Sequence, residues 1–203
     1  MAKIDFKREL KEFYRPSAKD FSIVDVPEMS FLMIDGHGDP NTSPRYQAAL
    51  QVLYGIAYAV KFLLKQDDSS PDYVVPPLEG LWWTADMATF SLDNKDAWDW
   101  TMMIMQPDWA TAEVVEVGKQ RAAKKSASPA LSEVRLAPYH EGLSIQILYT
   151  GPYDGESETI AKMHTHAIEQ GYKLAGKHHE IYLSDPRRTA PEKLKTVLRQ
   201  PIR

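Results

Sequence analysis

The chain has 203 residues, 43% of them hydrophobic, and a formal net charge of −4 at neutral pH. This length suffices to bury a core, and the absence of cysteine excludes disulfides, thiolate metal sites and cysteine nucleophiles. Basic residues are scattered along the chain, which argues against direct binding to nucleic acid. Neither a signal peptide nor a long uninterrupted apolar run is recognisable, so we expect a soluble, cytoplasmic protein with no membrane contact.

The first helix and strand can be placed from residue patterns. Residues 1–20 carry charges of both signs and few apolar positions, which predicts a solvated arm or a short surface helix. Residues 21–34 are mostly β-branched or large and apolar but contain a proline, which indicates two strands or one bent strand. A long amphipathic helix follows, with Ser43 as N-cap, Pro44 as first residue and apolar side chains at helical spacing up to Leu64.

Two strands and a second helix complete the first half of the chain. Short apolar runs predict strands at 81–84 and 98–104, and a helix is expected from about residue 108 to residue 124. Residues 124–129 are rich in lysine, serine and alanine, which is typical of a connector.

After this connector the same order of elements begins again. A strand at 143–147 leads into a Gly-Pro turn, a helical stripe covers 160–168, and two strands are predicted at 179–184 and 194–198. Three segments of the two halves can be overlaid: 31–40 on 144–152, 81–84 on 181–184, and 100–107 on 195–201. The sequence therefore predicts an α+β fold with a duplicated β-α-β-β unit. We expect one structural domain, with an arm at 1–20 and repeats at 21–125 and 126–203, and a ligand cleft at the seam between the repeats.

Glu180 is the main candidate for chemistry. In the segment 178–184, the period of a strand places His178, Glu180, Tyr182 and Ser184 on one face. If this face lines a cleft, partial burial raises the pKa of Glu180, which can then act as a general acid or base or attract a lipophilic cation. The alternative is that this polar face simply meets solvent, as in many half-exposed strands.

The adjacent residues Trp82 and Trp83 are candidates for ligand contact. Neighbouring residues of a strand point to opposite faces, so at most one of the two packs in the core against the helices. The other faces a cleft or solvent, where it could support a ligand, but a one-residue register shift would exchange them. Trp82 overlays Tyr182, which gives each half an aromatic residue on equivalent faces. Together with Glu180, they suit a flat, apolar or cationic aromatic guest.

The remaining motifs argue against a metal or a cofactor. His164 and His166 point apart on a helix, while His178 and His179 lie on opposite faces of a strand. No H-E-x-x-H, nucleophile-elbow, P-loop or dinucleotide-binding motif is present. We therefore expect no metal and no cofactor.

Four segments carry a resemblance to a known family: FLMIDG at 31–36 with GDP at 38–40, EGLWW at 79–83, GPY at 151–153, and HHEIYLSDPRR at 178–188. In these segments the chain resembles the GyrI-like small-molecule-binding domains, which are related to the effector-binding modules of AraC-type and multidrug-responsive regulators. The resemblance implies tandem β-α-β-β units in a pseudo-symmetric curved antiparallel sheet, with helices on one face and a ligand cleft between the halves. It also implies that Glu180 lies inside the cleft.

The resemblance implies more than one function, because relatives sense drugs, inhibit gyrase by protein contact, or hydrolyse the strained cyclopropane of DNA-alkylating natural products. We find no helix-turn-helix segment beside the module and expect no transcription-factor activity from the chain alone. Our first hypothesis is a stand-alone xenobiotic-binding protein that hydrolyses electrophilic guests. Its catalytic residues would be Glu180 and Tyr182, and its ligand-binding residues Trp82, Trp83, Tyr149 and His178. The alternative is a protein-interaction module such as a gyrase inhibitor, with a protein partner.

Overall fold

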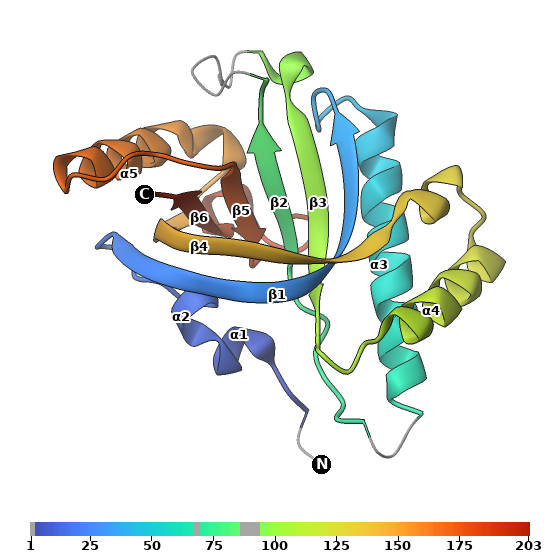
Figure 1. Cartoon of the computed structure of the whole chain (residues 1–203). Helices are drawn as coiled ribbons and strands as arrows, with labels where there is room; N and C mark the ends of the chain where they lie inside the picture. Colours follow the sequence, from blue (N-terminus) through green and yellow to red (C-terminus); the bar gives the residue numbers. More distant parts are fainter. Residues whose placement is uncertain (1–2, 67–69, 86–93) are drawn as a thin grey trace.

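The computed structural model describes residues 3–66, 70–85 and 94–203. Within them, six antiparallel strands close into a barrel in the order β1-β3-β2-β5-β6-β4 (Figure 1). The strands are β1 (Ser22–His37), β2 (Leu78–Trp83), β3 (Asp99–Gln106), β4 (Arg135–Thr150), β5 (His178–Tyr182) and β6 (Lys195–Pro201). The helices are α1 (Phe6–Glu9), α2 (Lys11–Tyr14), α3 (Pro44–Leu64), α4 (Ala112–Lys125) and α5 (Ser157–Glu169), joined by short 3-10 turns that include η2 (Lys95–Ala97) and η4 (Tyr153–Gly155).

The predicted duplication is confirmed by the order of the elements and by the strand registers. The first copy is β1-α3-β2-β3 and the second is β4-α5-β5-β6. At the seam, β2 and β5 pair antiparallel with Gly80 opposite Glu180. A pseudo-twofold axis therefore passes between these two residues. Trp82 lies two residues beyond Gly80 and Tyr182 two residues beyond Glu180, so the two aromatic residues are equivalent, as the sequence overlay predicted.

Residues 22–37 form one strand, which is one of the two predicted alternatives. Two details differ from the sequence-based expectations. The helix expected from residue 108 begins at Ala112, because the Thr111 side chain accepts a hydrogen bond from the backbone amide of Val114 and caps it. The overlay of the last strands was one residue out: Trp82 pairs with Trp100 and Tyr182 with Thr196, which makes Trp100 equivalent to Thr196.

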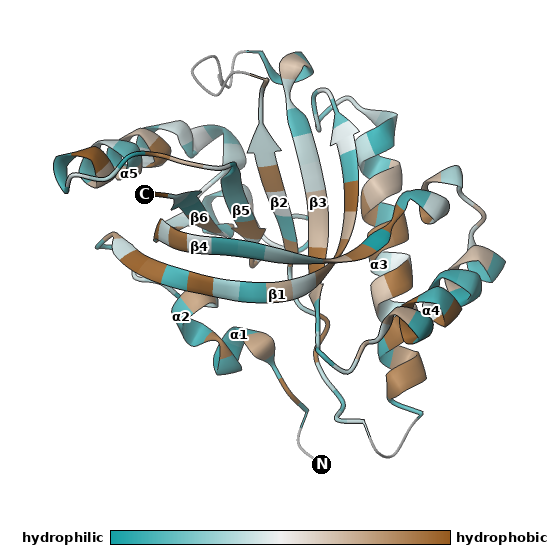
Figure 2. Cartoon of the chain, in the orientation of Figure 1, coloured by the Kyte–Doolittle hydropathy of each residue, from teal (hydrophilic) through white to brown (hydrophobic). Residues whose placement is uncertain are grey.

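Helix α3 supplies much of the core of the first repeat. The Ser43 side chain accepts a hydrogen bond from the backbone amide of Tyr46, which confirms the predicted N-cap. One face of α3 is buried against β1, β3 and α4, and includes Leu53 and Ile56. Figure 2 shows hydrophobic residues recurring along α3. Among the described residues α3 is also long and apolar enough to cross a membrane, which we did not expect from the sequence; here it packs as a core helix.

Gly36 on β1 makes room for the buried indole of Trp100. A Cβ atom at residue 36 would lie 2.1 Å from two atoms of that ring, and Trp100 has no exposed surface. We therefore expect Gly36→Ala to lower the free energy of unfolding by about 2 kcal/mol, measured by urea denaturation. Gly55→Ala on α3 is the control, because its Cβ would meet only the Cβ of Ala122 at 3.9 Å and alanine favours helix. Equal urea midpoints for Gly36→Ala and wild type would contradict this account of the packing.

The N-terminal segment is more than a solvated arm. It forms α1 and α2 as short helices, but Phe13 and Tyr14 at its end are buried in the core. The Tyr14 hydroxyl donates a hydrogen bond of 2.8 Å to Glu79 Oε1, and Gln146 Nε2 donates one of 2.8 Å to the backbone oxygen of Glu12. The end of the segment is therefore tied to the barrel, and the expectation of a purely solvated segment was wrong there because two large aromatic residues outweigh their charged neighbours.

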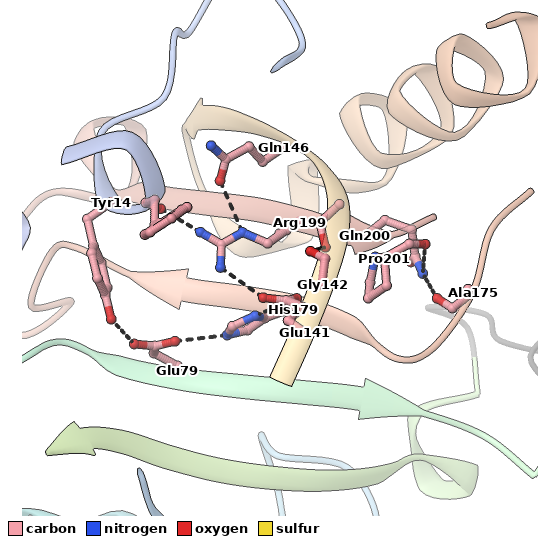
Figure 3. A network of polar contacts seen from close by, with 12 residues as sticks. Tyr14, Glu79, Glu141, Gly142, Gln146, Ala175, His179, Arg199, Gln200 and Pro201 are labelled. Atoms are coloured by element: carbon pink, nitrogen blue, oxygen red, sulfur yellow. Dashed lines mark hydrogen bonds and ion pairs between the residues drawn. The ribbon is translucent and has the colours of Figure 1, made fainter. Parts of the chain in front are cut away.

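Two acidic and two basic side chains meet inside the barrel (Figure 3). His179 Nδ1 lies 2.9 Å from Glu141 Oε1, and His179 Nε2 lies 3.0 Å from Glu79 Oε2. Arg199 Nη1 donates a hydrogen bond of 2.9 Å to Glu141 Oε2. All four side chains are about 1% exposed. We call Glu79, Glu141, His179 and Arg199 the interior ion network.

In this network, the paired charges shift the pKa values of His179 and Glu141 more than burial does. Burial acts to lower the pKa of His179, but the charges and hydrogen bonds of Glu141 and Glu79 outweigh it and raise this pKa to about 9. Burial likewise acts to raise the pKa of Glu141, but His179 and Arg199 lower it to about 2. The network therefore holds β2, β4, β5 and β6 together by pairs of opposite charge.

Candidate functional site

The candidate site lies where the two repeats meet on the outer, helix-bearing face of the barrel. There β2 and β5 run side by side between α3 and α5 (Figure 1). His178, Glu180 and Tyr182 of β5 share this face, as the period of the strand predicted. The side chain of Glu180 is 13% exposed and that of His178 2% exposed, so this polar face is largely covered and does not simply meet solvent.

A chain of hydrogen bonds across the pseudo-twofold axis fixes the Glu180 carboxylate. Trp82 Nε1 donates to the Tyr182 hydroxyl at 3.1 Å, and that hydroxyl donates to Glu180 Oε2 at 2.7 Å. His178 Nε2 lies 3.4 Å from Glu180 Oε1. Burial and the charge of Glu180 raise the pKa of Tyr182 well above its ordinary value, so its proton stays on the phenol and is directed at the carboxylate.

Aromatic rings from both repeats enclose this carboxylate. Tyr46 of α3 lies 6.1 Å from Trp82 between ring centroids, and Trp98 lies 5.4 Å from Trp82. In the second repeat, Tyr153 of η4 packs edge-on against Tyr182 at 5.6 Å. Burial is also the main cause that raises the pKa of Tyr153 to about 12. An acid surrounded by aromatic rings is suited to an apolar or cationic aromatic guest.

A second carboxyl group, Glu156, lies in the same site. It occupies the N-cap position of α5 and is 3% exposed. Burial, followed by the charge of Glu180, raises the pKa of Glu156 to about 9. Our sequence analysis missed this residue, because an acid just before a helix usually marks a solvated first turn. The sequence feature that could have pointed to Glu156 is its position five residues after Gly151, because the Gly151-Pro152 turn carries the chain back to the site.

Of the two adjacent tryptophans, only Trp82 belongs to the site. Trp82 is 3% exposed, faces the helices and contacts Tyr182. Trp83 points to the opposite face, where it packs against a buried cluster that includes Leu81 and Met103, and Lys177 Nζ lies 3.3 Å from the centroid of its ring. The sequence analysis placed the ligand platform on the tryptophan turned away from the helices, whereas the structure gathers Trp82, Tyr182 and Glu180 on the helix-bearing side. Trp83 is therefore not placed with Glu180.

Tyr149 lies at the edge of the site instead of its centre. Its hydroxyl donates a hydrogen bond of 3.1 Å to the backbone oxygen of Pro152. Burial, and then the charge of Glu156, raises the pKa of Tyr149. Within the described ranges, no group of three or more histidine, aspartate or glutamate side chains is arranged to hold a metal ion.

The sequence and the fold match known proteins over their whole length. Residues 19–203 match the family model described as GyrI-like small molecule binding domain. An uncharacterized conserved protein from Listeria innocua is 46% identical, with 99% of this chain and 100% of that chain covered and a TM-score of 0.92. A hydrolase encoded by lin2189 from Listeria innocua is 45% identical, with both chains fully covered and a TM-score of 0.88.

A more distant likeness shows the fold alone. The C-terminal domain of EcmrR is 9% identical, with 91% of this chain and 97% of that chain covered and a TM-score of 0.56. Among curated proteins, none matches this chain significantly.

Proposed function

Because this chain belongs to the family of GyrI-like small-molecule-binding domains, we propose that it binds an apolar or cationic aromatic xenobiotic between α3 and α5 and hydrolyses electrophilic guests there. The observation that carries this proposal is the carboxylate of Glu180, which is held by Tyr182 and enclosed by aromatic rings from both repeats. Such an acid serves both to attract a cation and to move a proton.

The binding half of the proposal rests on complementarity. Ring faces of Trp82, Tyr46 and Tyr153 offer apolar area and attract positive charge through their π-systems. The carboxylate adds a negative charge where water is largely excluded, and there its attraction for a cation is stronger than at an open surface. Tyr46 and Tyr153 come from different elements, so a guest can separate them without disrupting a strand pair.

The catalytic half of the proposal draws on similar proteins and on the geometry of the acid. Two Listeria innocua proteins, 45% and 44% identical, are described as hydrolases. In this chain, Glu180 would accept a proton from water while the water oxygen bonds to the electrophilic carbon of the guest. The bond between that carbon and its leaving atom breaks, and the leaving atom takes up the proton from Glu180. We propose a strained ring such as a cyclopropane as the guest. Both atoms of the broken bond belong to the ring, so the leaving carbon stays attached to the product.

Isothermal titration calorimetry with two compounds of the same shape tests the binding proposal. One is the cation 1-methylquinolinium and the other is the neutral 1-methylnaphthalene. We expect both to bind with dissociation constants of about 4 mM or lower, since about 0.3 kcal/mol for each of about eleven non-hydrogen atoms corresponds to that value. The cation should bind more tightly because of Glu180. Absence of heat with both compounds would contradict a site for aromatic guests.

A further inference from the structure

Glu156 gives the site a second carboxyl group, and we propose that this group holds a proton in the free protein and releases it when an organic cation binds. This inference rests on the proposed function and narrows the guest class to organic cations that are taken up in exchange for a proton. It assigns to Glu156 a role different from that of Glu180, which would remain the acid that contacts the guest first.

The position of Glu156 is unfavourable for a bare carboxylate. The residue is 3% exposed, and its Oε1 atom is buried with no hydrogen-bond partner among the described residues. A buried carboxylate oxygen without a donor carries a large desolvation cost if the group is ionised. The cost is much smaller when the group is protonated, and it is offset when a cation lies beside the carboxylate. The geometry thus fits a group that alternates between these two states.

The neighbours of Glu156 point in the same direction. The titratable and polar groups that face it or its nearest partners are Glu180 and Tyr182 of β5, Thr196 of β6, Tyr149 of β4, Tyr153 of η4 and Lys95 of η2. Lys95 is the cation of this set, and its effect on the pKa of Glu156 is smaller than those of burial and of Glu180. Two carboxylates in one poorly solvated site repel each other, so the pair retains one proton near neutral pH.

A guest cation changes this balance because its charge favours ionisation of both carboxyl groups. Binding then releases a proton, and by linkage the affinity for the cation rises with pH. Where one full proton is released, the dissociation constant falls about tenfold per pH unit, and the dependence ends above the pKa of the free group. A neutral guest of the same shape leaves the proton in place, so its affinity stays constant with pH.

The experiment uses 1-methylquinolinium and 1-methylnaphthalene with the full chain, titrated at about pH 7.5 and about pH 8.5. Both values lie below the pKa of about 9 of Glu156 in the free protein, where the exchange is expected to change the affinity with pH. For wild type, we expect an approximately tenfold lower dissociation constant for the cation at the higher pH and no change for the neutral compound. The variant Glu156→Gln should bind the cation with the same affinity at both pH values.

Counting protons on the wild type keeps the test independent of the variant's folding. Repeating the titration in two buffers of different ionisation enthalpy gives the number of protons released, which we expect to approach one for the cation and zero for the neutral compound. Binding of both compounds without proton release, or an unchanged pH dependence in folded Glu156→Gln, would overturn the exchange while leaving the proposed function intact. Failure of both compounds to bind at either pH would remove the proposed function and the exchange together.

Discussion

Glu141→Gln is expected to lower the free energy of unfolding by about 3–5 kcal/mol, because it removes one charge from a buried set and leaves the others uncompensated. His179 contacts Glu141 Oε1 and Arg199 contacts Glu141 Oε2, and none of the three side chains is more than 1% exposed. Urea denaturation near neutral pH measures the loss. A barrel that tolerated this change would not depend on the interior ion network.

The control is the same chemical change at an exposed ion pair. Glu158 on α5 lies 2.6 Å from Lys162 one turn further along the helix, and both side chains are more than half exposed. Glu158→Gln should cost less than about 0.5 kcal/mol, as is usual for exposed helical pairs. If both variants lost the same stability, or if Glu141→Gln lost less than about 1 kcal/mol, the buried pairing would not be a main source of stability.

The same network predicts how stability depends on pH. The pKa of Glu141 is lowered from 4.5 to about 2, so its stabilising effect is complete above 4.5 and is lost as the pH falls toward 2. The pKa of His179 is raised from 6.5 to about 9, so its stabilising effect is complete below 6.5 and is lost as the pH rises through 9. We therefore expect the free energy of unfolding to be largest between about pH 4.5 and about pH 6.5. Below this range it should fall less steeply with pH in Glu141→Gln than in wild type.

Glu180→Gln is expected to slow hydrolysis of an electrophilic guest by about 10²–10⁴-fold, the usual contribution of a positioned general acid or base. The amide has nearly the same shape and still accepts a hydrogen bond from the Tyr182 hydroxyl, so the site should remain assembled. The measurement is kcat/KM for a cyclopropane-bearing electrophile, with the ring-opened product quantified by mass spectrometry.

Neutral guests separate the two roles of Glu180. Binding of 1-methylnaphthalene should be little changed in Glu180→Gln, while binding of 1-methylquinolinium should weaken, because only the cation uses the charge. Glu158→Gln again provides a control that should keep wild-type turnover. If Glu180→Gln kept the wild-type rate, Glu180 would not be a catalytic residue. If the wild type itself were inactive, hydrolysis would be contradicted but the proposed binding would not.

The duplicated fold could be predicted from the sequence because each repeat has a clear local signature. These signatures can be recognised from residues that are close together in the sequence. They are the N-cap at Ser43, the helical spacing after it and the matching strands of both halves. The strand period also placed His178, Glu180 and Tyr182 on one face correctly. The equivalence of Trp82 and Tyr182 followed from the overlay and is confirmed by the register of β2 and β5.

The rest depends on contacts between distant residues, which no local pattern reveals. Glu79 and His179 are 100 residues apart in the sequence but lie within hydrogen-bond distance inside the barrel. The side on which Trp83 lies relative to Glu180 could not be predicted, because strand alternation says which residues share a face but not which face the helices cover. Glu156 was missed because its local sequence resembles an ordinary exposed helix start, while its burial and the influence of Glu180 and Thr196 depend on segments distant in the sequence.

The pairing of Gly80 with Glu180 on the pseudo-twofold axis has an evolutionary consequence. In an assembly of two identical, separate repeats, these positions would necessarily carry the same residue. Two glycines would leave no acid, whereas two glutamates would set like charges opposite each other, and a Cβ at residue 80 would lie 2.8 Å from the Trp82 indole nitrogen. Joining the repeats in one chain frees the two positions to diverge. A single central acid is thus available only to the fused descendant, and never to a homodimeric ancestor.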